Sequence, residues 1–252
     1  MSATLTCKNC NHLFEGNYCP RCGQSSHEGR IDLRYLLHDI PHSVFHIDRG
    51  FFYTAIALFT RPGKMLDNYL TGRRVNYFKP FAYVILMSTI GALLVKLLTS
   101  GLAAAYAKYN PGQTMPLREG FFNHYFSAFI FLMIPLVSLT TYLFFIRRRY
   151  NYWEHVVINT YIAAQLNVMQ VLIYTIAYIT VLVKHQFSVN GFTILVPFFM
   201  TGFLYLYGAS FGFLMKEPRS LFRLVITITL MNCLLSLLYI TGFRLAGIMT
   251  PW

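Results

Sequence analysis

Acidic residues are scarce in this chain. Only nine Asp and Glu occur among 252 residues, and charged residues of all kinds make up 12% of the total, whereas hydrophobic residues make up 56%. Soluble globular domains carry about 25% charged residues, so this composition excludes an ordinary soluble domain. Tryptophan occurs only twice, but phenylalanine and tyrosine bring the aromatic share to 17%. The composition predicts a membrane protein.

The familiar catalytic motifs are also missing. The sequence contains no Gly-x-Ser-x-Gly, no His-Glu-x-x-His and no glycine-rich phosphate loop, which are signatures of serine hydrolases, zinc peptidases and nucleotide-binding proteins. Internal repeats and low-complexity tracts are absent as well. Ion-coupled carriers place charged or histidine side chains inside their spans, and the predicted spans carry none near their midplanes, so coupled transport is disfavoured.

Five apolar stretches are each long enough to cross a bilayer, which takes about 20 residues. They cover residues 80–98, 124–146, 155–183, 192–215 and 221–243. All nine acidic residues lie outside these stretches. The fold class that we expect is an all-α polytopic membrane protein with five transmembrane helices, in which residues 80–252 form the transmembrane domain.

The distribution of Lys and Arg predicts the orientation, because these residues accumulate on the cytoplasmic side. Ten precede the first predicted span, three lie at 147–149 and three more join the last two spans, which places sixteen on one side and five on the other. We therefore expect the N-terminus in the cytoplasm and the C-terminus outside. The first long apolar run begins only near residue 80, so we expect no signal peptide.

The strongest motif is a pair of Cys-x-x-Cys units near the N-terminus. Two such pairs suit a tetrahedral four-thiolate site, and a cytoplasmic ribbon would keep its thiols reduced. We expect residues 1–30 to form a zinc ribbon with one structural Zn²⁺, which we favour over iron or a pair of disulfides. Gly23, and Asn11 in the equivalent place, are expected to adopt a positive φ. The ligands are Cys7, Cys10, Cys19 and Cys22.

The charge of this ribbon bears on its partner. Residues 1–30 carry Lys8, Arg21 and Arg30 against Glu15 and Glu28, and zinc with four thiolates adds about −2. Nucleic-acid binding depends on a clustered positive face, so it is disfavoured. The roles that we favour for the ribbon are a structural cap or a docking site for a protein partner.

Residues 31–79 form an amphipathic basic segment, which we call the collar. It is too polar to span a membrane and too apolar to be a linker, so we expect it to lie on the bilayer, with an interfacial or re-entrant helix over residues 51–59. Its basic side chains are candidates for binding anionic lipid headgroups. The same positive charges would also be expected if they serve only to set the membrane topology. They are Arg61, Lys64, Arg73, Arg74 and Lys79.

The collar also contains a cluster of histidines and aspartates. Four-residue spacing places the three histidines on one helical face, where they would suit a metal or acid/base site, although Pro41 interrupts such a helix. Histidines at a membrane surface also occur as headgroup-level side chains, and we favour that interpretation. The candidate catalytic residues are His38, Asp39, His42, His46 and Asp48.

Two predicted spans carry polar stripes. At about 100° per residue, the polar residues of the third span share one face, and a similar stripe lies on the fifth. We favour helix packing over a pocket or pore, because interhelical polar contacts stabilise packing without any further function. Gly208-x3-Gly212 permits close helix approach within the chain or in a homo-oligomer. The stripes comprise Asn159, Thr160, Asn167, Gln170, Tyr174, Thr229, Asn232, Ser236 and Tyr239.

Several short motifs accompany the cysteines in a fixed order. They are Arg30-Ile31, Leu36-Leu37-His38, Asp48-x-Gly50-Phe51, Arg61-Pro62-Gly63, Tyr69-x-x-Gly72-Arg73-Arg74 and Tyr77-x-x-Pro80-Phe81. With these motifs, residues 7 to about 95 resemble an uncharacterised family of bacterial membrane proteins, a domain of unknown function. The resemblance implies a bacterial inner-membrane protein with an N-terminal zinc ribbon, and it implies no reaction.

We therefore expect a multi-pass protein of the bacterial inner membrane that acts by binding. Its role would be that of a scaffold, assembly factor or regulatory module, with a protein partner at the cytoplasmic face and anionic lipids around the collar. A membrane-surface enzyme that uses the histidine cluster on a lipid or lipid-linked substrate is the first alternative. An oligomeric pore lined by the polar stripes is the second.

Overall fold

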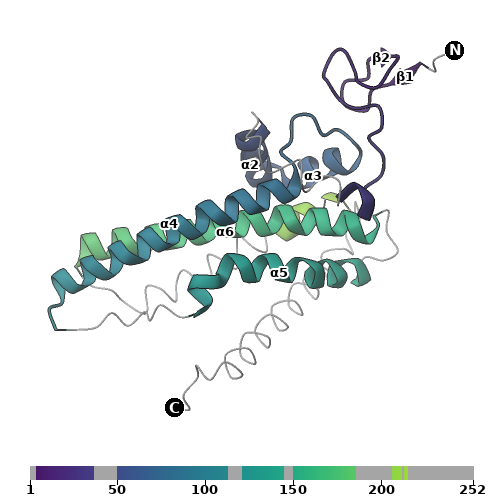
Figure 1. Cartoon of the computed structure of the whole chain (residues 1–252). Coiled ribbons are helices and arrows are strands. Elements are labelled where there is room, and N and C mark those ends of the chain that lie inside the picture. Colours follow the sequence, from purple (N-terminus) through teal and green to yellow (C-terminus); the bar gives the residue numbers. More distant parts are fainter. Residues whose placement is uncertain are drawn as a thin grey trace.

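The structure is a computed structural model that describes residues 4–36, 50–112, 121–144, 150–185, 206–211, 213 and 214. These residues form a small two-stranded ribbon followed by helices (Figure 1), which agrees with a mainly helical fold that carries a small N-terminal ribbon. The elements are β1 (Leu5–Thr6), β2 (Leu13–Phe14), α2 (Gly50–Thr60), α3 (Pro62–Leu70), α4 (Pro80–Tyr109), α5 (Phe121–Phe144) and α6 (Tyr152–Lys184).

The ribbon begins with an antiparallel strand pair. Leu5 pairs with Phe14 and Thr6 with Leu13, and Phe14 is buried against the cysteines. After the ribbon, residues 33–36 are helical, and this helix begins after Asp32. The Asp32 carboxylate accepts a hydrogen bond from the Tyr35 amide at 2.7 Å, which is the usual contact of an N-cap aspartate.

Helices α4 and α6 run parallel and side by side (Figure 1). At one end, the Tyr161 hydroxyl donates to the Phe78 carbonyl at 2.5 Å. At the other end, the side chain of Asn110 donates to the carbonyl of His185 at 3.3 Å. Helix α5 runs in the opposite direction and packs on α6. The ribbon and the N-terminal ends of α4 and α6 therefore lie at the same end of the bundle.

Both long helices begin at positions suited to a helix start. Helix α4 has Pro80 at its first position, where the missing N–H costs nothing. Helix α6 begins with a capping box, in which the Asn151 side chain accepts from the Glu154 amide while the Glu154 carboxylate accepts from the Asn151 amide. Each of these contacts satisfies one of the backbone donors that a helix N-terminus leaves unpaired.

Residues 50–79, which we call the platform, consist of α2, α3 and a loop that leads into α4. Arg61-Pro62-Gly63 separates the two helices, as expected, and Gly63 also meets a tight packing constraint. A Cβ atom added there would lie 2.2 Å from the Phe213 Cβ and 2.5 Å from the Ala209 carbonyl oxygen. Only glycine fits where α3 meets this segment.

The expectation of five transmembrane spans is not supported. Of the described helices, α4 and α6 are long and apolar enough to cross a membrane. The predicted stretch 124–146 overlaps α5, and the described side chains of α5 include the apolar segment Phe131–Leu143. Most of 192–215 and all of 221–243 lie outside the described residues. The described helices α4 and α6 are also longer than the predicted 80–98 and 155–183.

Candidate metal centre and its docking site

The four predicted cysteines converge. Their sulfur atoms all lie within 4.8 Å of one another; those of Cys7 and Cys22 are 3.5 Å apart and those of Cys10 and Cys19 are 3.6 Å apart. A tetrahedral Zn²⁺ with Zn–S distances of about 2.3 Å separates its sulfurs by roughly 3.8 Å. The four side chains therefore fit a tetrahedral thiolate site for a single metal ion.

The backbone builds this site from two equivalent turns. In the first turn, the Cys7 amide donates to the His12 carbonyl and the Cys7 carbonyl accepts from the Asn11 amide, both at 2.9 Å. In the second, Cys19 makes the same two contacts with Gln24 and Gly23, both at 2.8 Å. Asn11 has a φ of 59° and Gly23 a φ of 76°, which confirms the prediction for both positions.

The thiols influence each other's ionisation. Burial alone would raise the pKa of Cys7, but the backbone amides of Cys10 and Asn9 and the neighbouring thiols lower that pKa to about 7. The His12 amide acts to lower the pKa of Cys10, yet burial and the neighbouring thiols raise it to about 12. Four adjacent thiolates repel one another, so a bound cation is needed to deprotonate all of them.

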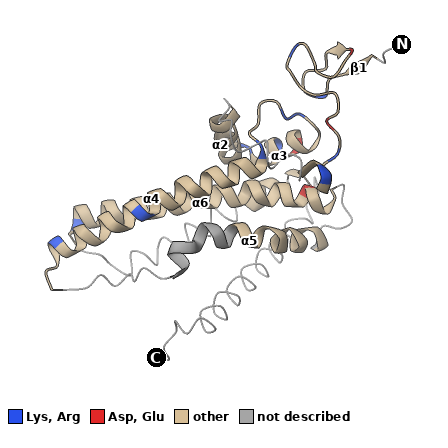
Figure 2. Cartoon of the chain, viewed as in Figure 1, with Lys and Arg blue, Asp and Glu red and all other residues tan. Residues whose placement is uncertain are grey.

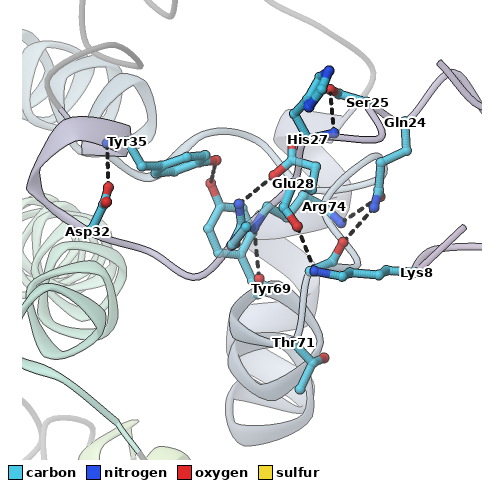
Figure 3. Close-up of polar contacts among 12 residues, drawn as sticks. Lys8, Gln24, Ser25, His27, Glu28, Asp32, Tyr35, Tyr69, Thr71 and Arg74 are labelled. Carbon is cyan, nitrogen blue, oxygen red and sulfur yellow. Dashed lines mark hydrogen bonds and ion pairs between the residues drawn. The ribbon is translucent and has the colours of Figure 1, made fainter. Parts of the chain in front are cut away.

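The ribbon is fixed to the platform by Gln24 and Arg74 (Figure 3). The Gln24 side chain is buried; its amide nitrogen donates to the Gly72 carbonyl at 2.8 Å and its oxygen accepts from the Arg74 amide at 3.4 Å. Helix α3 ends just before these groups in a Schellman motif, in which the Gly72 amide donates to the Tyr69 carbonyl and the Arg73 amide to the Asn68 carbonyl. Gly72 has a φ of +98°, a conformation that favours glycine.

Every nitrogen of the Arg74 guanidinium has an acceptor. Nε donates to the Tyr69 carbonyl and Nη2 to the Gly29 carbonyl, both at 3.0 Å, while Nη1 pairs with the Glu28 carboxylate. The guanidinium also lies over the rings of Tyr35 and Tyr69, at 4.6 and 5.3 Å from their centroids. Burial alone would lower the pKa of Arg74, but Tyr35, Tyr69 and Glu28 raise it.

A second ion pair joins the ribbon to α6. Arg30 binds Glu154 through two nitrogens, at 3.0 and 3.1 Å, and the hydrogen bonds and charge of Glu154 raise the pKa of Arg30. The next residue, Ile31, is fully buried, and its carbonyl accepts from the Asn151 side chain at 2.9 Å. Residues 28–31, which we call the tether, therefore contact both the platform and α6.

One family of known proteins is similar to the platform and the start of α4. Residues 48–91 match a family of proteins of unknown function, DUF3667. The match fits the expected resemblance to an uncharacterised family, and it includes the loop that holds the ribbon. No curated protein and no solved structure is significantly similar to the chain.

The predicted lipid-binding residues do not behave as one group. The Arg74 side chain is 6% exposed, and its donors are engaged by the tether and the platform. Arg61, Lys64, Arg73 and Lys79 are exposed. Arg74 differs from the others because Glu28, Gly29 and the two tyrosine rings enclose it.

The predicted polar face of α6 is buried. Asn159 donates to Thr141 on α5 at 2.9 Å and accepts from Tyr207 at 2.8 Å, and Asn167 donates to Ser88 on α4 at 3.2 Å. Thr160, Gln170 and Tyr174 are buried as well. These contacts fit helix packing. Thr229, Asn232, Ser236 and Tyr239 lie outside the described residues, as do His38, Asp39, His42, His46 and Asp48.

Sequence reasoning did not identify the residues that dock the ribbon, namely Gln24, Glu28, Arg30 and Glu154. The pattern Asn151-x-x-Glu154 is a readable capping signal, but nothing local pairs Arg30 with a residue 124 positions away. His155 was not predicted as a site residue either, because it lies at the margin of the predicted span. In the structure it is buried, and its ring nitrogen lies 3.2 Å from the Thr141 hydroxyl.

Proposed function

We propose that the protein is an integral membrane protein in which a zinc ribbon caps the cytoplasmic end of a helical bundle and presents a binding surface to a protein partner. The observation that carries this proposal is the double attachment of the tether, through Glu28–Arg74 and Arg30–Glu154. A ribbon held at two points is a rigid cap rather than a freely moving domain, and rigid surfaces bind at lower entropic cost.

The surface of the bundle supports its placement in a membrane. Only 28% of the most apolar window of α4 and 44% of that of α6 are buried, whereas the core helix of a soluble protein is mostly buried. Large apolar side chains point outward along both helices, among them Leu93, Leu97 and Val183. Such an exposed apolar surface is stable against lipid and costly in water.

The charges support the cytoplasmic orientation of the ribbon end. Figure 2 shows charged residues gathered around the ribbon and the nearby ends of the helices, with further Lys and Arg along α4. The tether and the platform, which carry Arg30, Arg61, Lys64, Arg73, Arg74 and Lys79, lie with the ribbon at the end of the bundle where α4 and α6 begin (Figure 1). A concentration of Lys and Arg at one end favours the cytoplasmic side for it.

Helix α2 supports an interfacial position for the platform. One side of it is buried, with Thr54, Ala57 and Leu58 inside, while Phe52 is 73% and Ile56 63% exposed on the other. An exposed aromatic and aliphatic face beside the start of a spanning helix suits the boundary between headgroups and acyl chains. Arg61, which follows the last residue of α2, donates to the Tyr53 hydroxyl at 3.4 Å.

The partner-binding surface that we propose is the outer side of the ribbon. Leu13 on β2 is 63% exposed, on the same face as its exposed partner Thr6 on β1 and on the face opposite to Phe14, in a domain too small to need Leu13 for its own core. Apolar side chains exposed on a rigid frame are typical of protein interfaces. This surface leaves the docking contacts of Gln24 and the tether undisturbed.

Site-specific photo-crosslinking in native membranes tests the partner proposal. A photoreactive residue at Thr6 or Leu13 should yield a discrete protein adduct, because a partner covers this side of the ribbon. The same residue at Leu93 or Leu97, which face lipid in the proposal, should yield none. Identical patterns at both pairs of positions, or no adduct from the ribbon, would contradict the proposal.

A separate measurement tests the orientation. A membrane-impermeant thiol reagent, applied to metal-depleted protein, should label the ribbon cysteines in inverted vesicles and leave them unlabelled in right-side-out cells. Labelling in intact cells would contradict a cytoplasmic ribbon.

A further inference from the structure

Lys96 is exposed near the middle of α4. The sequence predicts a span over residues 80–98, which would place Lys96 at the margin of the membrane. Helix α4 instead continues to Tyr109. In the proposed membrane placement, Lys96 therefore lies inside the spanning helix rather than at its end.

The length of α4 sets the depth of this lysine. Lys79 precedes α4 and Lys108 lies in its last turn; at 1.5 Å per residue the two are about 44 Å apart, which matches a bilayer of about 40–45 Å with its headgroup layers. Lys96, about 26 Å from Lys79, then lies about 4 Å from the midplane and about 11 Å inside the nearer edge of a hydrocarbon core of about 30 Å. A lysine side chain extends roughly 6 Å, which is too short to carry its ammonium to that edge.

Nothing in the described part of the chain neutralises this ammonium. The Lys96 side chain makes no ion pair or hydrogen bond with a described residue. A charged side chain inside the hydrocarbon core is costly unless it meets an opposite charge or a water-filled space. The described acidic residues all lie near the ribbon end of the bundle, where Figure 2 shows them in red. They are Glu15, Glu28, Asp32, Asp67 and Glu154.

The surface of α4 around Lys96 consists of small side chains. At 100° per residue, four small residues lie within 40° of Lys96 around the helix axis, and all of them are exposed. The Ser100 hydroxyl is satisfied within the helix, because it donates to the Lys96 carbonyl at 2.9 Å. Small residues let two transmembrane helices approach closely. We call this face the α4 seam; it comprises Ala92, Lys96, Ser100, Ala103 and Ala107.

The neighbouring exposed surface has a different character. On α4, the exposed residues Leu93, Leu94 and Leu97 lie 60° or more from Lys96 around the helix axis. Such large aliphatic side chains suit contact with lipid chains, so small size and charge together distinguish the α4 seam. Helix α6 likewise exposes large aliphatic residues, namely Leu172, Ile176, Ile179, Leu182 and Val183.

We infer that the α4 seam binds a transmembrane helix of another protein, and that this helix carries an Asp or Glu near the bilayer midplane. Its carboxylate forms an ion pair with the Lys96 ammonium, and the small side chains of the seam allow the two backbones to approach. The inference rests on the proposed membrane placement of α4, and it adds a contact inside the bilayer to the partner surface of the ribbon.

Two other occupants fit the α4 seam less well. A second copy of this chain lacks the acid, because all nine Asp and Glu lie outside its five apolar stretches. A lipid phosphate lies at the depth of the headgroups, and the Lys96 ammonium falls short of the edge of the hydrocarbon core by about 5 Å. A helix that brings its own carboxylate to the midplane meets neither difficulty.

Site-specific photo-crosslinking of the full chain in native membranes tests the inference. A photoreactive residue at Ala103 should yield a discrete protein adduct, whereas the same residue at Leu97, about 100° from Lys96 around the helix axis, should yield none. Mass spectrometry of the Ala103 adduct should place the crosslink in an apolar segment of about 20 residues that contains an Asp or Glu. Lys96→Met should reduce the adduct yield about tenfold, the usual range for a lost hydrogen bond to a charged group, and Lys96→Arg should preserve it.

Lys108→Met is the matched control. It makes the same charge change at the end of α4 and should change the adduct yield less than twofold. Equal losses in Lys96→Met and Lys108→Met would overturn the inference, as would a crosslinked segment that contains no acidic residue. An Ala103 position that yields no adduct, or an adduct only with lipid or with a second copy of the chain, would also overturn it.

The outcomes separate the inference from the proposed function. A protein adduct from Thr6 or Leu13 on the ribbon, with none from Ala103, overturns the contact inside the bilayer alone. Protein that is extracted from membranes by alkaline carbonate overturns the membrane placement on which both depend.

Discussion

Replacing Arg74 by methionine should release the ribbon from the platform without unfolding either. The substitution removes the partner of Glu28 and leaves the Tyr69 and Gly29 carbonyls without their donor. Breaking a buried ion pair costs about 3–5 kcal/mol. Water can reach the Glu28 side chain, which is 21% exposed, so we expect the lower end of that range, about 3 kcal/mol.

Two variants calibrate this value. Arg73→Met changes an exposed neighbour and should cost less than about 0.5 kcal/mol, as is usual for surface positions. Arg74→Lys keeps the charge but cannot reach three acceptors at once, because an ammonium is a point donor and a guanidinium a planar fork. We expect an intermediate cost of roughly 1.5 kcal/mol, close to one charged hydrogen bond.

Hydrogen–deuterium exchange of the metal-loaded protein in detergent measures the effect. About 3 kcal/mol corresponds to a loss of protection of about 150-fold, since 1.4 kcal/mol is a factor of ten, in peptides covering residues 24–31 and 69–78. The amides of Cys7, Asn11, Cys19 and Gly23 should keep their protection, because the metal site holds them. Equal protection in Arg74→Met and Arg73→Met would refute the reasoning.

Three further predictions follow from single contacts. Glu154→Ala should destabilise the chain by about 2 kcal/mol, because it removes a helix cap of about 1 kcal/mol and an ion pair of at most about 1 kcal/mol to Arg30, whose side chain is 61% exposed. Glu154→Gln keeps the cap and should cost about 0.5 kcal/mol. Equal losses of stability for the two variants in denaturant titration would argue against the capping role. Gly63→Ala should destabilise the chain by about 3 kcal/mol, because the added methyl group would overpack the contact with Ala209 and Phe213. The control Gly29→Ala should cost less than about 0.5 kcal/mol. Equal midpoints of thermal unfolding for the two variants would contradict that packing. Without metal, burial and the neighbouring thiols raise the pKa of Cys10 to about 12, so zinc must displace the Cys10 proton when it binds. The zinc affinity, measured by competition titration, should therefore fall at least tenfold per pH unit as the pH drops from 8 to 6. An affinity that does not change with pH would show that Cys10 is not a ligand.

Much of the ribbon could be predicted from sequence, because metal ligation imposes local spacing. The two Cys-x-x-Cys units and the positive φ of Asn11 and Gly23 follow from residues within a few positions of each other. The break at Arg61-Pro62-Gly63 and the turn at Gly72 are local as well, since proline and glycine act on their own backbone. The buried polar face of α6 follows from helical periodicity.

The docking of the ribbon could not be predicted, because it depends on pairs far apart in the chain. Glu28 meets Arg74 across 46 positions and Arg30 meets Glu154 across 124, and no local pattern specifies such partners. Arg74 and Arg73 are adjacent and alike in sequence, yet one is buried and the other exposed. Only the tertiary arrangement of Tyr35, Tyr69 and the tether makes that difference.

The metal content per purified chain tests the central claim most directly. We predict one zinc in the wild type, one in a His38→Ala/His42→Ala/His46→Ala variant and none in Cys19→Ser/Cys22→Ser. In the loaded proteins, X-ray absorption should show four sulfur neighbours of the zinc at about 2.3 Å. Two metals in the wild type that fall to one in the histidine variant would contradict it, and would favour a membrane-surface enzyme over a binding module.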